Sequence, residues 1–128
     1  MATATTQPGA ATPPPAATPV TPEEMAAVGA ALADTTRVRM LRLLEANEEV
    51  ACAALEATFD LTKSTISYHV RVLRHAGLIR VRKAGKFYHY GLLRAEVERR
   101  FPGLLTMLAA TELSEIAGAA DESAARCE

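Results

Sequence analysis

The strongest constraint on the fold is a change of periodicity after residue 76. Residues 62–76 carry an apolar side chain at about every third or fourth position, as one face of a helix does. Gly77 then stands where a left-handed residue commonly ends a helix, and apolar and polar residues alternate beyond it. The sequence therefore predicts a helix that leads directly into β structure.

This β structure is predicted to be a hairpin. In residues 79–82 two aliphatic side chains point to one face and two arginines point to the other, and residues 87–90 form the return strand. The pair Ala84-Gly85 is predicted to make the turn between them. In the return strand, either the two tyrosines or the phenylalanine and histidine face the core, and the pattern does not decide between these pairs.

Capping signals predict helices on both sides of this region. A capping box at Thr21–Glu24, with a proline at the first helical position, starts one helix. Asp34 caps a second helix, which ends near Asn47, and a third, short helix covers residues 51–59 before a tight turn. After the hairpin, a last helical region is broken at Pro102.

The predicted order of elements indicates the fold class. A short helix, a tight turn, a longer capped helix and a two-stranded wing together are typical of a winged helix-turn-helix. We therefore predict a mainly α domain with a small β-hairpin wing over residues 21–117. Residues 1–20 consist largely of Ala, Thr and Pro and are predicted to be a disordered tail, and residues 118–128 a flexible C-terminal tail.

Charge is segregated along the chain. The formal net charge is −1, yet eight of the 14 Lys and Arg residues lie between Asp60 and Arg94, where Asp60 is the only acid before Arg94. A basic segment of this kind favours a polyanionic partner, because the local field matters more than the total charge. An ordinary solvated surface is the alternative explanation.

The helix predicted over residues 62–76 carries hydrogen-bonding and cationic side chains opposite its apolar face. Such a face is typical of a helix that reads base edges in the major groove, and free amides at its N-terminus attract phosphate. The predicted DNA contacts of this helix are Thr62, Lys63, Ser64, Ser67, Tyr68 and Arg71. The wing is predicted to contact the DNA backbone through Arg82, Lys83 and Lys86, which flank the turn.

Apolar side chains at helical spacing also occur near both ends of the predicted domain. A central region of about 60 residues buries little apolar surface by itself, so these outer helices are predicted to join two copies of the chain across a two-fold axis. Completion of a monomeric core is the alternative. The predicted dimerisation residues are Met25, Val28, Leu32, Leu104, Leu105, Met107 and Leu108.

Several classes of protein are not supported by the sequence. It contains no Gly-rich phosphate loop, nucleophile triad or paired carboxylates, so no enzyme is predicted. No apolar run reaches the roughly 18 residues that a membrane span needs. The first residues show neither the basic nor the apolar region of a signal peptide, so secretion is not expected. The two cysteines, Cys52 and Cys127, lie far apart, and a cytoplasmic protein with no membrane partner is expected.

Three segments resemble the ArsR/SmtB family of winged-helix repressors: LADTTRVRMLRLL, FDLTKSTISYHVRVLRHAGLI and VRKAGKFYHYGL. The resemblance implies a homodimer, joined through its first and last helices, that binds a palindromic operator in double-stranded DNA and leaves it when an effector arrives. It adds Thr65 to the predicted reading residues and implies that His69 packs beneath the reading helix. The sequence identifies neither an effector nor the operator.

The chain departs from the metal sensors of this family. They carry a Cys-x-Cys motif before the reading helix, or Asp and His pairs on the last helix. Here the first stretch holds the single Cys52, and no histidine follows His89. Neither arrangement provides a tetrahedral ligand set, so no metal site and no cofactor is predicted.

Two alternatives to a DNA-binding repressor remain at this point. The basic face of the winged helix could instead meet an acidic protein partner. Cys52 and Cys127 could form a redox switch in a repressor, provided that the two can meet. A preference for duplex DNA separates the first alternative from a repressor.

Overall fold

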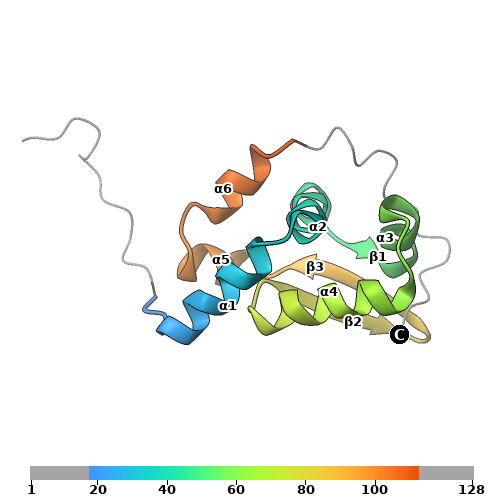
Figure 1. Ribbon diagram of the computed structural model, residues 1–128, viewed down its shortest axis with the longest axis horizontal. Coiled ribbons are helices and arrows are strands. Elements are labelled where there is room, and N and C mark those ends of the chain that lie inside the picture. Colours follow the sequence, from blue (N-terminus) through green and yellow to red (C-terminus); the bar gives the residue numbers. More distant parts are fainter. Residues whose placement is uncertain (1–17, 113–128) are drawn as a thin grey trace, which may run out of the picture.

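The computed structural model describes residues 18–112 as six helices and three short strands. Figure 1 shows α1, α5 and α6 together at one end, α3 and β1 at the other, and α2 between them. The elements follow in the order α1 (Pro22–Leu32), α2 (Thr35–Ala46), β1 (Val50–Ala51), α3 (Cys52–Phe59), α4 (Lys63–His75), β2 (Ile79–Ala84), β3 (Phe87–Leu92), α5 (Arg94–Arg100) and α6 (Leu104–Ala109).

The predicted winged helix-turn-helix is confirmed, with α3 and α4 as the helix-turn-helix and the β2–β3 hairpin as the wing. Residues 1–17 and 113–128 lie outside the described part of the chain, and these ranges hold most of the two predicted tails. Within the described part, Thr18 lies before α1, and its backbone N–H donates to the carbonyl of Arg99 at 2.9 Å.

The predicted helix starts are confirmed by their hydrogen bonds. Thr21 Oγ1 accepts from the Glu24 backbone N–H at 3.0 Å, and Glu24 Oε1 accepts from that of Thr21 at 2.9 Å, which completes the capping box. Asp34 caps α2 by accepting from the Arg37 backbone N–H at 3.1 Å. These caps satisfy amides that have no partner inside their own helices.

The turn between α3 and α4 is short because Asp60 adopts a left-handed conformation with φ of 55°. Thr62 then caps α4 by accepting from the Thr65 backbone N–H at 3.2 Å. At the other end, Gly77 has φ of 77°, as the sequence predicted for the residue that ends this helix. These two conformations fix where α4 begins and how the chain leaves it for the wing.

The sheet differs from the predicted hairpin in two respects. It has three strands in the order β1-β3-β2, because Val50 pairs with Tyr90 in an antiparallel register that the sequence analysis did not predict. The wing turn lies at Gly85 and Lys86, one residue later than predicted, since Ala84 pairs with Phe87. Gly85 has φ of 65°, a backbone conformation that L side chains rarely adopt, so the position of the glycine selects this register.

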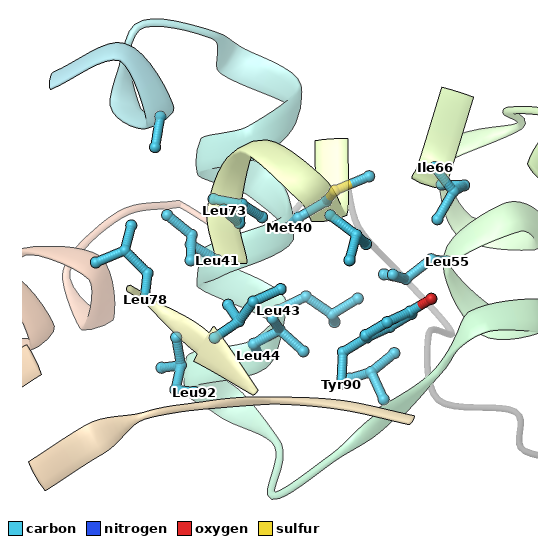
Figure 2. Packing of buried hydrophobic residues seen from close by; sticks show 14 of the residues in the cluster. Met40, Leu41, Leu43, Leu44, Leu55, Ile66, Leu73, Leu78, Tyr90 and Leu92 are labelled. Carbon is cyan, nitrogen blue, oxygen red and sulfur yellow. The ribbon is translucent and has the colours of Figure 1, made fainter. Parts of the chain in front are cut away.

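The core lies between α2, α3, α4 and the sheet, as Figure 2 shows. It draws leucines from several elements, each at most 5% exposed, together with Met40 of α2, Ile66 of α4 and Tyr90 of β3, each at most 3% exposed. The last helical region is interrupted as predicted, because α5 ends before Pro102 and α6 begins after Gly103. This core fixes the position of α4 relative to the wing.

Candidate nucleic-acid interface

The outer face of α4, called the reading helix below, presents the side chains that the sequence predicted to contact DNA. Lys63, Ser64, Tyr68 and Arg71 are exposed, and Tyr68 retains 52% of its accessible surface. The opposite face of the helix is buried through Ile66, among others. The helix therefore separates an apolar face in the core from a polar and cationic face in solvent.

Three hydroxyl groups gather at the start of the reading helix. Besides capping the helix, Thr62 Oγ1 donates to Thr65 Oγ1 at 3.1 Å and lies 3.3 Å from Ser64 Oγ. Thr62 is one of the DNA contacts that the sequence predicted. In the structure its hydroxyl closes the local cap, while the neighbouring Lys63 extends from the same end of the helix as an exposed cation.

Beneath the reading helix lies a buried polar contact. Arg37 of α2 is 8% exposed, and its Nη1 lies 3.1 Å from Nδ1 of His69, which is also 8% exposed. Its remaining nitrogens donate to the carbonyls of Ala31 and Ala30 at 3.1 and 3.0 Å, at the end of α1. Arg37 thereby connects α1, α2 and the reading helix, and His69 packs under this helix as the family resemblance implied.

Electrostatics favours a neutral His69. Burial lowers the pKa of His69, and the positive charge of Arg37 lowers it further, whereas Asp34 opposes the shift. A neutral imidazole whose Nδ1 is unprotonated can accept a hydrogen bond from the arginine, and a protonated one cannot. The hydrogen bond between Arg37 and His69 therefore requires a neutral His69.

The wing carries the second set of predicted DNA contacts, and its arginines are already engaged. Glu49, just before β1, accepts from Arg82 Nη2 at 2.8 Å and Nε at 2.9 Å, and from Arg80 Nη1 at 2.7 Å. Hydrogen bonds from Arg82 and then Arg80 lower the pKa of Glu49 to about 2. Arg82 thus faces solvent with much of its charge compensated.

The two lysines of the wing lie beyond this ion-pair cluster. Lys83 and Lys86 are exposed, and the Lys83 ammonium sits 5.6 Å from the centroid of the Tyr88 ring. Lys86 occupies the turn itself. Among the three wing residues predicted to contact DNA, these two have no ion pair in the part of the chain that the structure describes.

A cavity of about 510 Å³ lies between the reading helix and the wing. The structure settles which aromatic pair of β3 turns inward, because both tyrosines line this cavity whereas Phe87 is 40% exposed. The sequence analysis did not predict the cavity. Its lining residues are Ser67, Val70, Arg71, Arg74, His75, Val81, Tyr88 and Tyr90.

Three residues of the wing contacts and the cavity were missed by sequence reasoning. Glu49 lies outside the basic segment, and only the pairing of β1 with β3 brings it to the wing. Arg74 and His75 follow the predicted contacts on the same helix, and their spacing from Arg71 places them on its cavity side. The helical repeat was the available signal for Arg74 and His75, while no local signal marked Glu49.

The predicted dimerisation residues divide into two groups. Met25 of α1 and Met107 of α6 are exposed by 53% and 68%, respectively, and Leu32, Leu104 and Leu105 are half-buried. The remaining two belong to the core of the protomer, since Val28 is 5% and Leu108 4% exposed. Any contribution of these two to a dimer would therefore come through the helices that carry them.

Cys52 is fully buried and belongs to the core, while Cys127 lies outside the described residues. A redox pairing of the two stays a prediction. Within residues 18–112, no group of three or more His, Cys, Asp or Glu side chains is arranged to hold a metal ion. None of the helices in the same range is long and apolar enough to span a membrane.

Comparison with known proteins identifies relatives of this architecture. Residues 32–82 match a helix-turn-helix domain family. The transcriptional repressor SmtB homolog of Synechocystis is 33% identical over 70 residues, which cover 55% of this chain and 52% of that repressor. The chain spans 59% of another curated relative, so it matches only part of the length of these proteins.

Solved structures of relatives share this fold. An ArsR-like transcriptional regulator from Rhodococcus is 30% identical with a TM-score of 0.53, and the match covers 59% of this chain and 69% of that one. The winged helix-turn-helix DNA-binding domain of Mb0332 from Mycobacterium bovis, described as homodimeric, is 28% identical with a TM-score of 0.57. That match covers 69% of this chain and 80% of that domain.

Proposed function

Because the chain belongs to the ArsR/SmtB family of winged helix-turn-helix transcriptional regulators, we propose that it binds double-stranded DNA as a homodimer and represses transcription from a palindromic operator. One relative is named a transcriptional repressor, and one structural neighbour is a homodimeric DNA-binding domain. We further propose that it acts by binding rather than by catalysis. As a DNA-binding regulator, it would work in the cytoplasm.

One observation carries the proposal: the exposed face of the reading helix. Lys63, Ser64, Tyr68 and Arg71 offer hydrogen bonds, an aromatic ring and positive charge on one side of a helix whose other side is anchored in the core. A helix of this kind fits the major groove, where such groups distinguish base pairs. The sequence between Asp60 and Glu96 contains no acid that would repel the phosphates.

The wing would contribute differently. Lys83 and Lys86 lie at its tip, where contacts to phosphate position a protein on DNA and carry little sequence information. We assign base recognition to the reading helix and positioning to the wing. Thr62 and Thr65 would support the reading helix mainly through its cap, and Ser67 from its half-buried edge.

The proposed dimer uses α1 and α6, which lie at the same end of the molecule (Figure 1). Met25 and Met107 leave apolar surface in solvent there, and burial of an apolar side chain stabilises an interface by about 1.5–3 kcal/mol. A two-fold dimer would present two reading helices to successive turns of the major groove. Two half-sites would then be related by the same symmetry as the protein.

The proposal is tested by selecting bound sequences from random duplex DNA with the full chain. We expect an enriched motif with two-fold symmetry and a steep loss of affinity with rising salt. Equal, weak binding to all duplexes would contradict it and would favour the alternative of a protein-interaction module.

The dimer needs a separate test. Met107→Asp places a charge on the proposed interface and is expected to shift the sedimentation coefficient toward that of a monomer. The matched control is Thr106→Asp, at an exposed neighbouring position of α6. A wild-type chain that sediments as a monomer at micromolar concentration would refute the dimer.

A further inference from the structure

The cavity between the reading helix and the wing has the dimensions of a small-molecule site. Its volume is about 510 Å³, and ligand pockets commonly measure about 300–1,000 Å³. The reading helix forms one wall, and the two strands of the wing form the other. A ligand held there would touch both parts of the proposed DNA-binding surface.

One side of the cavity is cationic. Arg71, Arg74 and His75 line it, and within residues 18–112 their side chains have no hydrogen bond or ion pair. None of the lining residues is acidic. Glu56 of α3 lies outside the lining but is near enough to raise the pKa of Tyr90. Unengaged guanidinium groups favour an anion, because they bind a carboxylate through two parallel hydrogen bonds.

The other side of the cavity is apolar and aromatic. Val81 and the rings of Tyr88 and Tyr90 form it, and Tyr90 is 3% exposed. Burial raises the pKa of Tyr90 to about 12, and Tyr88 raises it further, while Arg74 opposes the rise. Tyr90 therefore stays neutral near pH 7 and adds no negative charge to this wall. A flat apolar group would displace water from such a surface favourably.

From this pairing of walls we propose that the cavity binds a small carboxylic acid with a planar, apolar body. The carboxylate lies against Arg74 and its neighbouring cations, and the planar body lies between the aliphatic and tyrosine side chains. A DNA phosphate could reach the exposed Arg71, but it has no apolar part to cover the opposite wall. The composition of the cavity therefore favours the small acid over the DNA backbone.

Occupancy of this site has a consequence that rests on the proposed DNA-binding function. Arg71 lines the cavity and also belongs to the predicted reading face. An acid that engages Arg71 and fills the space beside the wing competes with the duplex for the same side chain. By linkage, the acid weakens DNA binding by the same factor by which DNA weakens binding of the acid.

The test uses 2-naphthoate as the probe and 2-naphthamide as its neutral analogue. Each is titrated into the full-length, ¹⁵N-labelled protein while amide chemical shifts are followed. We expect 2-naphthoate to shift amides around Arg74 and Tyr88 and to bind about tenfold or more tightly than the amide. Equal affinities for the two compounds, or no shifts at the cavity, would overturn the proposal.

A pair of matched variants locates the site. Arg74→Gln removes a cation from the cavity and is expected to weaken 2-naphthoate binding by about tenfold. Arg99→Gln makes the same change on the exposed surface of α5 and is expected to leave it unaltered. Amide spectra establish that both variants are folded, and equal loss in both would overturn the site assignment.

The last arm separates this proposal from the proposed function. Inorganic phosphate and a duplex are titrated in place of the probe, and duplex affinity is measured with and without 2-naphthoate. Cavity shifts with duplex and phosphate but none with 2-naphthoate would make the cavity part of the DNA backbone contact and overturn the proposal. Binding of 2-naphthoate by a chain that binds no duplex would support the site and refute the DNA-binding function.

Discussion

The reading helix and the wing hold their polar side chains in different ways. Lys63 and Tyr68 extend from a helix that is fastened underneath by Arg37 and His69, so support and contact lie on opposite faces. On the wing, Glu49 holds Arg82 on the exposed surface itself. Support by a buried network leaves a contact face available, whereas support by a surface ion pair uses part of that face.

This contrast suggests a division of labour in binding. Side chains fixed by a rigid helix can be selective, because their positions relative to base edges are set before DNA arrives. A guanidinium shared with a carboxylate must exchange that partner for a phosphate, so its net contribution is small.

The largest effect is expected from removing the support of the reading helix. Arg37→Ala leaves the carbonyls of Ala30 and Ala31 and the ring of His69 without their donor. We expect the free energy of unfolding to fall by about 2–4 kcal/mol, measured by urea denaturation with circular dichroism. Arg39→Ala, at an exposed position of the same helix, should change it by less than about 1 kcal/mol, because interactions of exposed charged side chains contribute little. Similar losses in both variants would mean that the buried contact is not the support described above.

The next effect concerns recognition by the reading helix. Lys63→Ala and Tyr68→Ala should each weaken binding to a selected operator by about 1–3 kcal/mol and reduce the preference over unrelated duplexes. Fluorescence anisotropy with operator and scrambled duplexes measures both quantities. If both variants kept the wild-type preference for operator over scrambled duplex, this helix would not be the part that recognises bases.

A fall in pH should reduce the stability from the Arg37–His69 contact and from the Glu49 ion pairs in separate pH ranges. The pKa of His69 is lowered in the folded protein, so the unfolded chain takes up the proton first, and stability is lost as pH falls below about 6.5. The pKa of Glu49 is lowered to about 2 in the folded protein. Its contribution to the free energy of unfolding is therefore fully present above pH 4.5 and is lost between pH 4.5 and about 2. Thermal unfolding between pH 8 and pH 3 measures the profile.

Variants assign the two ranges. His69→Gln should abolish the loss of stability that begins below pH 6.5 and keep the loss below pH 4.5. Glu49→Gln should abolish the loss below pH 4.5 and keep the one that begins below pH 6.5. A profile that is flat between pH 7 and pH 5 in the wild type would contradict the role given to His69.

Glu49→Gln should also change DNA binding. The substitution removes a negative charge beside the wing and releases Arg82 and Arg80 toward the phosphates. We expect binding to all duplexes to become about two- to fivefold tighter, with a steeper dependence on salt, since more phosphate contacts are made. Glu48→Gln, at the adjacent exposed position, is the control. Weaker binding in the Glu49 variant would show that the ion pairs position the wing for DNA.

The smallest effect is expected at the tip of the wing. Lys83→Ala should weaken binding about equally for every sequence and reduce the salt slope by about one. The measurement is a titration at several salt concentrations with operator and scrambled duplexes. A loss of affinity for the operator alone would mean that the wing recognises bases, which contradicts the assignment of base recognition to the reading helix.

Local sequence was enough to predict the helices, the two strands of the wing and the exposed face of the reading helix. The caps at Thr21, Asp34 and Thr62 and the left-handed Gly77 act over three or four residues, so local sequence is enough to place them. The helical repeat in residues 62–76 likewise fixes which side chains are buried and which remain outside. The wing turn was misplaced by one residue because Ala84-Gly85 and Gly85-Lys86 both offer a glycine.

The contacts that join distant segments depend on how the whole chain packs. The pairing of β1 with β3 brings Glu49 to Arg82, 33 residues away, and the packing of α2 brings Arg37 to His69, 32 residues away. The cavity likewise exists because the reading helix and the wing are held at a fixed separation. A two-residue strand and a single buried arginine carry no periodic signal, and their partners are selected by the packing of the whole core.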